Sequence, residues 1–100
     1  MTIAVIGAGA SGMMAALTAA ETPENKILLF ERQARVGRKL AVTGNGRCNL
    51  SNESIDIRRY NHPAFVESIM GPQPEQDLES FFSSLGIMTI REEGRLYPRS

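Results

Sequence analysis

The residues with the clearest chemical capability lie near the start of the chain, in the run Gly7-Ala8-Gly9-Ala10-Ser11-Gly12. In a Gly-x-Gly-x-x-Gly turn the first glycine permits the bend, the second leaves the backbone open to a pyrophosphate, and the third lets the next helix pack closely. The first N–H groups of that helix have no partner within it, and they attract phosphates. Pyrophosphate binding is therefore predicted, with these candidate residues: Gly7, Gly9, Ala10, Ser11 and Gly12.

An acidic residue, Glu31, follows the turn by about 20 residues, where dinucleotide-binding proteins carry a carboxylate. A carboxylate accepts hydrogen bonds from ribose hydroxyls, which favours an adenosine without a 2′-phosphate. The alternative is a glycine-rich turn of some other α/β protein, in which Glu31 is a solvated strand end. The agreement of turn, acid and flanking elements favours dinucleotide binding.

Three elements must hold these residues in place. The short apolar runs Ile3–Ile6 and Ile27–Phe30 predict strands, and Met13–Ala20 has the composition of a helix. Such a crossover is nearly always right-handed and places both strands in one parallel sheet. The expected fold class is α/β, beginning with the βαβ part of a Rossmann-like domain. The paired methionines Met13 and Met14 are expected in its core.

Helices and a β-hairpin are expected after this unit. Residues 32–52 predict a long loop with a short helix that begins near Val36. A helix should start at Pro63, with His62 as a turn or cap residue rather than a catalytic base. A second helix, Glu75–Leu85, should bury the stripe Leu78, Phe81, Phe82 and Leu85. The final elements are two strands and their turn: Ile87–Arg91, Arg95–Tyr97 and Glu93-Gly94.

Composition limits the class of protein. Of 100 residues, 42% are hydrophobic and 22% are charged, with a formal net charge of zero, which is typical of a soluble globular protein. No apolar stretch approaches the roughly 18 residues of a membrane span, and the first strand leaves no room for a signal peptide. We therefore expect a cytoplasmic protein with no membrane or nucleic-acid partner. Because a doubly wound domain usually has five or six strands, residues 1–100 are expected to be one incomplete domain, the front of a longer protein.

Two groups of side chains leave alternatives open. A basic cluster is either a solvated loop or a phosphate-facing rim, and we favour the rim because the glycine turn is near; its members are Arg32, Arg35, Arg38, Lys39 and Arg47. The single cysteine, Cys48, is either a redox thiol activated by Arg47 or a small packed residue, and we favour packing. No His/Cys cluster has the spacing of a metal site, so no metal is expected.

Several motifs occur in the order seen in one protein family. Besides the glycine turn they are Glu31-Arg32, Gly37-Arg38-Lys39, Thr43-Gly44-Asn45-Gly46-Arg47-Cys48-Asn49 and Gly94-Arg95-Leu96-Tyr97-Pro98. On these residues the chain resembles the bacterial BaiN-like flavoproteins, also called aminoacetone oxidase family FAD-binding enzymes or NAD(P)/FAD-dependent oxidoreductases. The resemblance covers essentially the whole chain.

The resemblance implies the N-terminal FAD-binding segment of a flavin-dependent oxidoreductase, with NAD(P)H as a candidate electron donor and a small molecule as substrate. It implies that Glu31 holds the adenosine ribose and that Arg38 and Lys39 lie near phosphate or ribose. The loop Thr43–Asn49 would reach toward the flavin ring. Further cofactor-binding residues that it implies are Arg32, Thr43, Gly44, Asn45 and Gly46. No catalytic residue is assigned. The alternatives are an NAD-binding dehydrogenase segment and a non-catalytic, truncated nucleotide-binding remnant.

Overall fold

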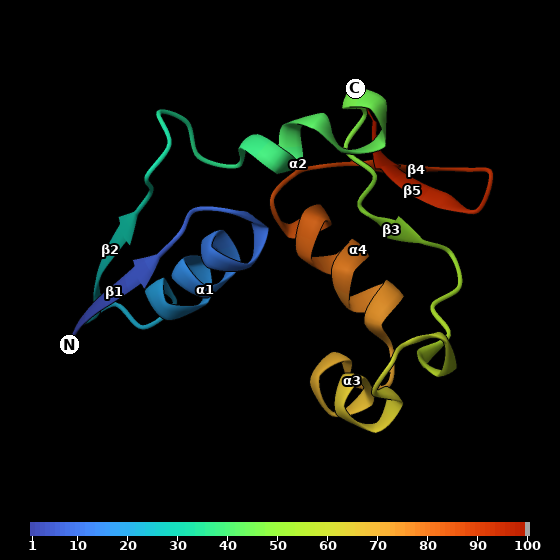
Figure 1. Ribbon diagram of the computed structural model, residues 1–100, viewed down its shortest axis with the longest axis horizontal. Helices are drawn as coiled ribbons and strands as arrows, with labels where there is room; N and C mark the ends of the chain where they lie inside the picture. The colour runs from blue at the N-terminus through green and yellow to red at the C-terminus, as the bar shows by residue number, and fades with distance from the viewer. Residues whose placement is uncertain (100) are drawn as a thin grey trace. The chain divides into compact units, whose positions relative to one another are not determined.

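A computed structural model describes residues 1–99 of the chain (Figure 1). The chain divides into two compact units, the first from Met1 to Gly46 and the second from Arg47 onward. Within the described residues, no helix is both long enough and apolar enough to cross a membrane.

The first unit is the predicted strand–helix–strand arrangement. Strands β1 (Thr2–Ile6) and β2 (Lys26–Phe30) are parallel, with Ile3 opposite Ile27. Helix α1 (Ala10–Ala20) packs against both strands. It begins three residues before the predicted Met13, because the Met13 N–H already bonds to the Gly9 carbonyl oxygen at 2.9 Å. The glycine run therefore includes the first helical turn.

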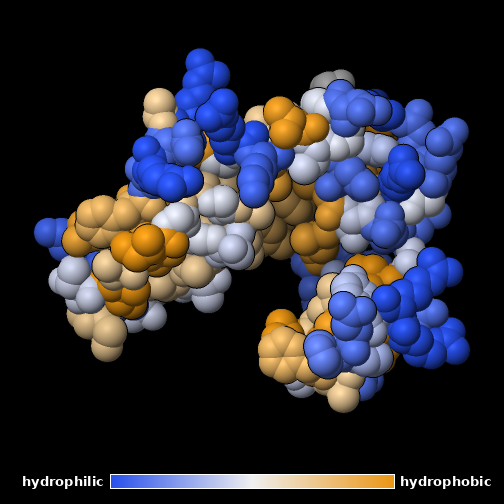
Figure 2. Space-filling view, in the orientation of Figure 1, coloured by the Kyte–Doolittle hydropathy of each residue, from blue (hydrophilic) through white to orange (hydrophobic). Residues whose placement is uncertain are grey.

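Within residues 1–46, helix α1 covers one face of this small sheet. Along β1 exposed and half-buried side chains alternate, because α1 covers the face that carries Ile3 and Val5. Figure 2 shows apolar side chains on the surface of this unit, and Ile6 is 80% exposed. The expectation for Met14 was wrong, since it is 41% exposed while Met13 is half-buried. Consecutive residues on a helix point about 100° apart, so both cannot face the same sheet.

Between residues 31 and 46 the first unit contains a loop and two short helical segments. Helix α2 spans Arg38–Val42 and starts after Gly37, whose φ of 62° is left-handed. The next turn, η1 (Thr43–Gly46), contains two consecutive left-handed residues, Gly44 and Asn45. The predicted loop with a short helix is confirmed, except that the helix begins at Arg38 and that Ser51–Asn52 form a strand.

The second unit is built on a three-stranded antiparallel sheet in the order β3-β5-β4. The predicted hairpin is confirmed as β4 (Thr89–Glu92) and β5 (Arg95–Pro98), and its turn has positive φ at both Glu93 and Gly94, as a type I′ turn requires. Strand β3 (Ser51–Asn52) was not predicted, because two residues are too few to show an alternating pattern.

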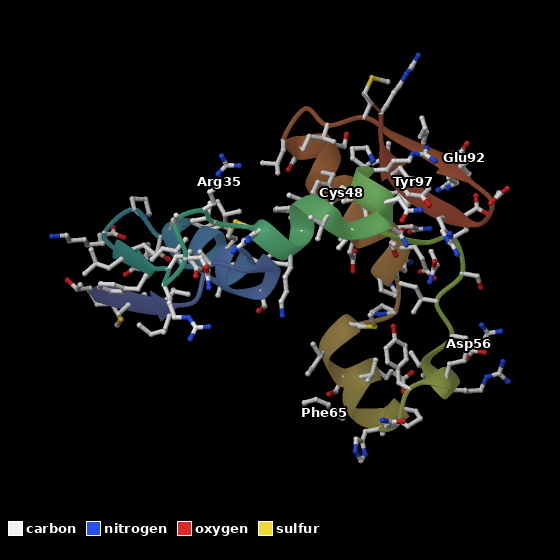
Figure 3. The ribbon with its side chains drawn as sticks, turned by 45° about the horizontal axis from the view of Figure 1, so that its top comes forward. Arg35, Cys48, Asp56, Phe65, Glu92 and Tyr97 are labelled. Atoms are coloured by element: carbon white, nitrogen blue, oxygen red, sulfur yellow. The ribbon has the colours of Figure 1, made fainter. Side chains whose placement is uncertain are left out.

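Three helical segments complete the second unit: η2 (Ile57–Arg59), α3 (Pro63–Met70) and α4 (Pro74–Ser84). Both α-helices begin with proline, whose missing N–H costs nothing at the first helical position. His62 occupies the N-cap position of α3, and Phe65 projects from that helix (Figure 3).

The core of the second unit lies on the central strand, where Leu96 and Tyr97 are only 4% and 7% exposed. Helix α4 packs against β4, and its Phe81 and Phe82 rings meet edge to face with centroids 5.2 Å apart. The predicted buried stripe is only half-buried at Leu78, Phe81 and Phe82, and it is wrong at Leu85, which is 54% exposed. Leu85 is the C-cap residue, and the left-handed Gly86 then redirects the chain.

Candidate nucleotide-binding site

The turn after β1 is tied to the rest of the first unit by its own backbone. Gly7, at a φ of 96°, donates its N–H to the Phe30 carbonyl oxygen at 2.7 Å. The Ala8 carbonyl oxygen accepts the Gly37 N–H at 2.8 Å, just before α2 begins. Ala8 is fully buried. These bonds fix the turn between the end of β2 and the start of α2.

Glu31 adds a side-chain link to the same turn. Its Oε2 atom accepts the Ala8 N–H at 2.8 Å, and its Oε1 atom accepts the Gln33 N–H at 3.0 Å. These donors favour the charged form and lower the pKa of Glu31, and the Gln33 N–H has a larger effect than the Ala8 N–H. Each carboxylate oxygen keeps a lone pair for a further donor. The carboxylate is thus ionised, oriented and still able to accept ribose hydroxyls.

An open hollow of about 640 Å³ lies beside this carboxylate. It brings together Gly9, Glu31, Arg32, Arg38 and Lys39 from the predicted site. The sequence did not single out Ala8, Gln33 or Val42, and Arg35 was only one member of the basic cluster. The residues that line the hollow are Ala8, Gly9, Glu31, Arg32, Gln33, Arg35, Arg38, Lys39 and Val42.

The cations of the hollow have no carboxylate partner within ion-pair distance in the described part of the chain. The ion pairs that residues 1–99 form use Arg47, Arg58 and Arg91. Arg35 extends from the outside of the loop after β2 (Figure 3). Since Glu31 is the one acidic residue in the lining, the hollow carries an excess of positive charge and suits an anionic ligand.

Gly9 and Gly12 occupy very different surroundings. A Cβ atom on Gly9 would have no atom within 4 Å, so this backbone faces open space. A Cβ atom on Gly12 would lie 1.8 Å from the carbonyl oxygen of Gly7. Gly12 therefore allows α1 to contact the turn, whereas Gly9 leaves room that a ligand can occupy.

The other predicted residues, Ala10, Ser11 and Thr43–Gly46, do not line the hollow, although they are close in sequence to residues that do. Ala10 and Ser11 form the first turn of α1, whose leading N–H groups have no intrahelical acceptor. The Thr43 hydroxyl donates to the Leu40 carbonyl oxygen at 2.9 Å. Residues 44–46 all have positive φ and form a left-handed turn after α2. A flavin contact by Thr43–Gly46 stays a prediction.

Arg47 differs from the other members of the basic cluster. It forms an ion pair with Glu92, and its guanidinium carbon lies 4.2 Å from the centre of the Tyr97 ring. Figure 3 shows Glu92 and Tyr97 on the hairpin of the second unit. Arg47 is therefore engaged within the second unit, and the cations lining the hollow are the other four members of the cluster: Arg32, Arg35, Arg38 and Lys39.

Three curated proteins of two kinds are similar to most of this chain. A 3-dehydro-bile acid delta(4,6)-reductase of Clostridium scindens is 39% identical over 98% of the chain and 25% of its own length. A ribosomal RNA dihydrouridine synthase of Haemophilus influenzae is 30% identical over 93% of the chain and 24% of its length, and that of Escherichia coli is 31% identical over 83% and 21%. The chain thus spans a quarter or less of the length of these relatives.

The family comparison covers every residue of the sequence. A model described as the HI0933-like protein Rossmann domain matches residues 1–100. This match agrees with the parallel β1–β2 pair and the glycine turn that precedes α1. The chain therefore belongs to the HI0933-like protein family and carries sequence of its Rossmann-type nucleotide-binding domain.

Proposed function

We propose that this chain is the FAD-binding segment of a flavin-dependent oxidoreductase, and that the hollow beside Glu31 takes the ADP half of FAD. One observation carries the proposal. The Glu31 carboxylate is oriented by the Ala8 and Gln33 N–H groups at the edge of a cationic hollow. A carboxylate that meets ribose and cations that meet phosphate are the two requirements of an ADP site.

The residues present fit this group. The open space at Gly9 admits a pyrophosphate close to the backbone, beside the leading N–H groups of α1. Glu31 holds the adenosine ribose, and Arg32, Arg38 and Lys39 offset the phosphate charge. Thr43–Gly46 lies toward the flavin ring. When bound, the flavin supplies hydride transfer, and the protein supplies binding and orientation.

The substrate proposed is a small molecule that is reduced, with NAD(P)H as electron donor. The support is that the relative with 39% identity over 98% of the chain is named as a reductase of a bile acid. The dihydrouridine synthases are named for ribosomal RNA and are less similar. Incubating the full-length protein with NADPH and either a 3-dehydro-Δ4,6 bile acid or ribosomal RNA separates the two. Oxidation of NADPH that depends on RNA would refute a small-molecule substrate.

The FAD assignment is tested on full-length protein by its visible absorption spectrum and by titration with FAD and with NAD. We expect a flavin spectrum and tighter binding of FAD than of NAD. Glu31→Ala and Gly9→Val should each weaken FAD binding, because the first removes the ribose acceptor and the second fills the open space. Unchanged FAD affinity in both variants refutes the site, tighter binding of NAD favours the dehydrogenase alternative, and no binding of either favours a non-catalytic remnant.

A further inference from the structure

Gln33 links the two kinds of group that line the hollow. Its backbone N–H donates to Glu31 Oε1 at 3.0 Å. Its side-chain Oε1 accepts a hydrogen bond from an Nη atom of Arg38 at 3.3 Å. The ribose acceptor and one of the cations are therefore connected through a single residue that is neither acidic nor basic.

Arg38 needs such a partner to keep its position. It is the first residue of α2, directly after Gly37, whose N–H bonds to the Ala8 carbonyl oxygen of the glycine turn. Its backbone is thus fixed beside the turn, but its long side chain retains several rotatable bonds. Immobilising a long, flexible side chain of this kind costs conformational entropy. A neutral acceptor restrains the guanidinium without cancelling its charge, which a carboxylate would do.

We propose that Gln33 is a positioning residue that holds the Arg38 guanidinium ready for the phosphates of the bound nucleotide. The proposal rests on the proposed ADP site. Phosphate pairs best with an arginine whose planar fork already faces it, since less freedom is then lost on binding. Gln33 therefore raises affinity for the phosphate-bearing part of the ligand and leaves recognition of the nucleoside to Glu31.

The two links of Gln33 can be separated experimentally. Replacing Gln33 by Met keeps the length of the side chain and the backbone N–H that bonds to Glu31. It removes the side-chain amide, whose oxygen is the acceptor for Arg38. Gln76→Met is the matched control, because Gln76 is an exposed glutamine on α4 and is not among the residues that line the hollow. The probes are ADP and adenosine, which differ only in the phosphates.

Isothermal titration of the full-length protein, freed of any cofactor, gives both affinities for each variant. We expect Gln33→Met to weaken ADP binding about threefold, and Arg38→Met about tenfold, with adenosine affinity unchanged in both. In the Arg38→Met background, Gln33→Met should have no further effect, because no guanidinium remains to be held. Gln76→Met should match the wild type.

Three results would overturn the positioning role while the ADP site stands. They are an unchanged ADP affinity in Gln33→Met, an equal loss for adenosine, or a threefold loss that persists without Arg38. A wild-type protein that binds neither ADP nor FAD instead overturns the proposed function, and the role of Gln33 with it.

Discussion

Replacing Gly12 by alanine tests the packing of α1 on the glycine turn, because two physical effects predict opposite signs. Helix propensity alone favours alanine over glycine by about 1 kcal/mol, so Gly12→Ala would stabilise α1. The structure predicts the reverse, since the new Cβ atom would lie 1.8 Å from the Gly7 carbonyl oxygen and 2.9 Å from its carbon. Both are backbone atoms and cannot rotate away.

The size of the effect follows from the distance that must be regained. Real Cβ atoms essentially never approach another heavy atom closer than 3.0 Å, so the helix and the turn must separate by at least 1.2 Å, the difference between 3.0 and 1.8 Å. The turn resists this movement, because Gly7 is held to Phe30 by a 2.7 Å hydrogen bond. Overpacking of this kind costs about 3 kcal/mol, which exceeds the gain in propensity.

Urea denaturation of the full-length protein, followed by far-ultraviolet circular dichroism, measures the free energy of unfolding. Gly9→Ala is the matched control, because its Cβ atom would meet nothing within 4 Å and its φ of −80° suits alanine. We expect it to cost no more than about 1 kcal/mol, the penalty for alanine at an N-cap. If Gly12→Ala is as stable as the wild type, the close contact between helix and turn is refuted.

The same pair of variants separates folding from binding. FAD at a hundredfold excess over its Kd should add about 2.7 kcal/mol to the stability of the wild type. Gly9→Ala should lose most of this increment, because its Cβ atom occupies the space proposed for the pyrophosphate. A full increment in Gly9→Ala would show that the ligand does not approach this backbone.

Three further predictions concern side-chain contacts in the two units. Hydrogen bonding lowers the pKa of Glu31, so its stabilising contribution is present above the ordinary pKa of 4.5 and is lost as the pH falls through the lower pKa of the folded state. The difference in unfolding free energy between wild type and Glu31→Gln should therefore shrink below about pH 4.5. A constant difference down to about pH 2 would contradict this. Tyr97→Ala removes a buried ring under the Arg47 guanidinium and should lower the free energy of unfolding in urea by about 3 kcal/mol. Tyr97→Phe keeps the ring and should lower it far less. Equal losses of stability in the two variants would show that the hydroxyl is the important group. Glu75→Gln weakens the acceptor for the Ile55 N–H, so hydrogen exchange at that amide should accelerate severalfold while exchange in β5 stays slow.

The sequence predicted those parts of the fold whose cause is local. Alternating or continuous apolar runs gave β1, β2 and the hairpin, and prolines and glycines marked where helices begin and end. Strand β3 was missed because its two residues pair with β5, which lies more than forty positions farther along the chain. The expectation that Leu85 is buried was wrong because the helical period does not hold at Leu85, which is the C-cap residue before the left-handed Gly86.

The sequence indicated several residues that gather at the candidate site, but not the hydrogen bonds that hold them there. Glu31 and the glycine turn follow from residue type and spacing. Residue spacing alone could not show that the Glu31 carboxylate would bond to the N–H groups of Ala8 and Gln33. Arg47 shows the opposite error, since proximity in sequence grouped it with the hollow although Glu92 and Tyr97 engage it in the second unit.

The double use of Glu31 explains why the turn can be ready for a ligand. A glycine-rich segment loses much conformational entropy when it is ordered, and in this turn only the small Ala8 side chain is buried to offset that loss. Here the Glu31 carboxylate and the Phe30 carbonyl oxygen accept N–H groups of the turn, so the ordering cost is met within the protein. A ligand that later bonds to the same carboxylate meets an acceptor already charged and aimed. Stability of the turn and affinity for the nucleotide should therefore decline together when Glu31 is replaced, whereas replacement of Lys39 should lower affinity alone.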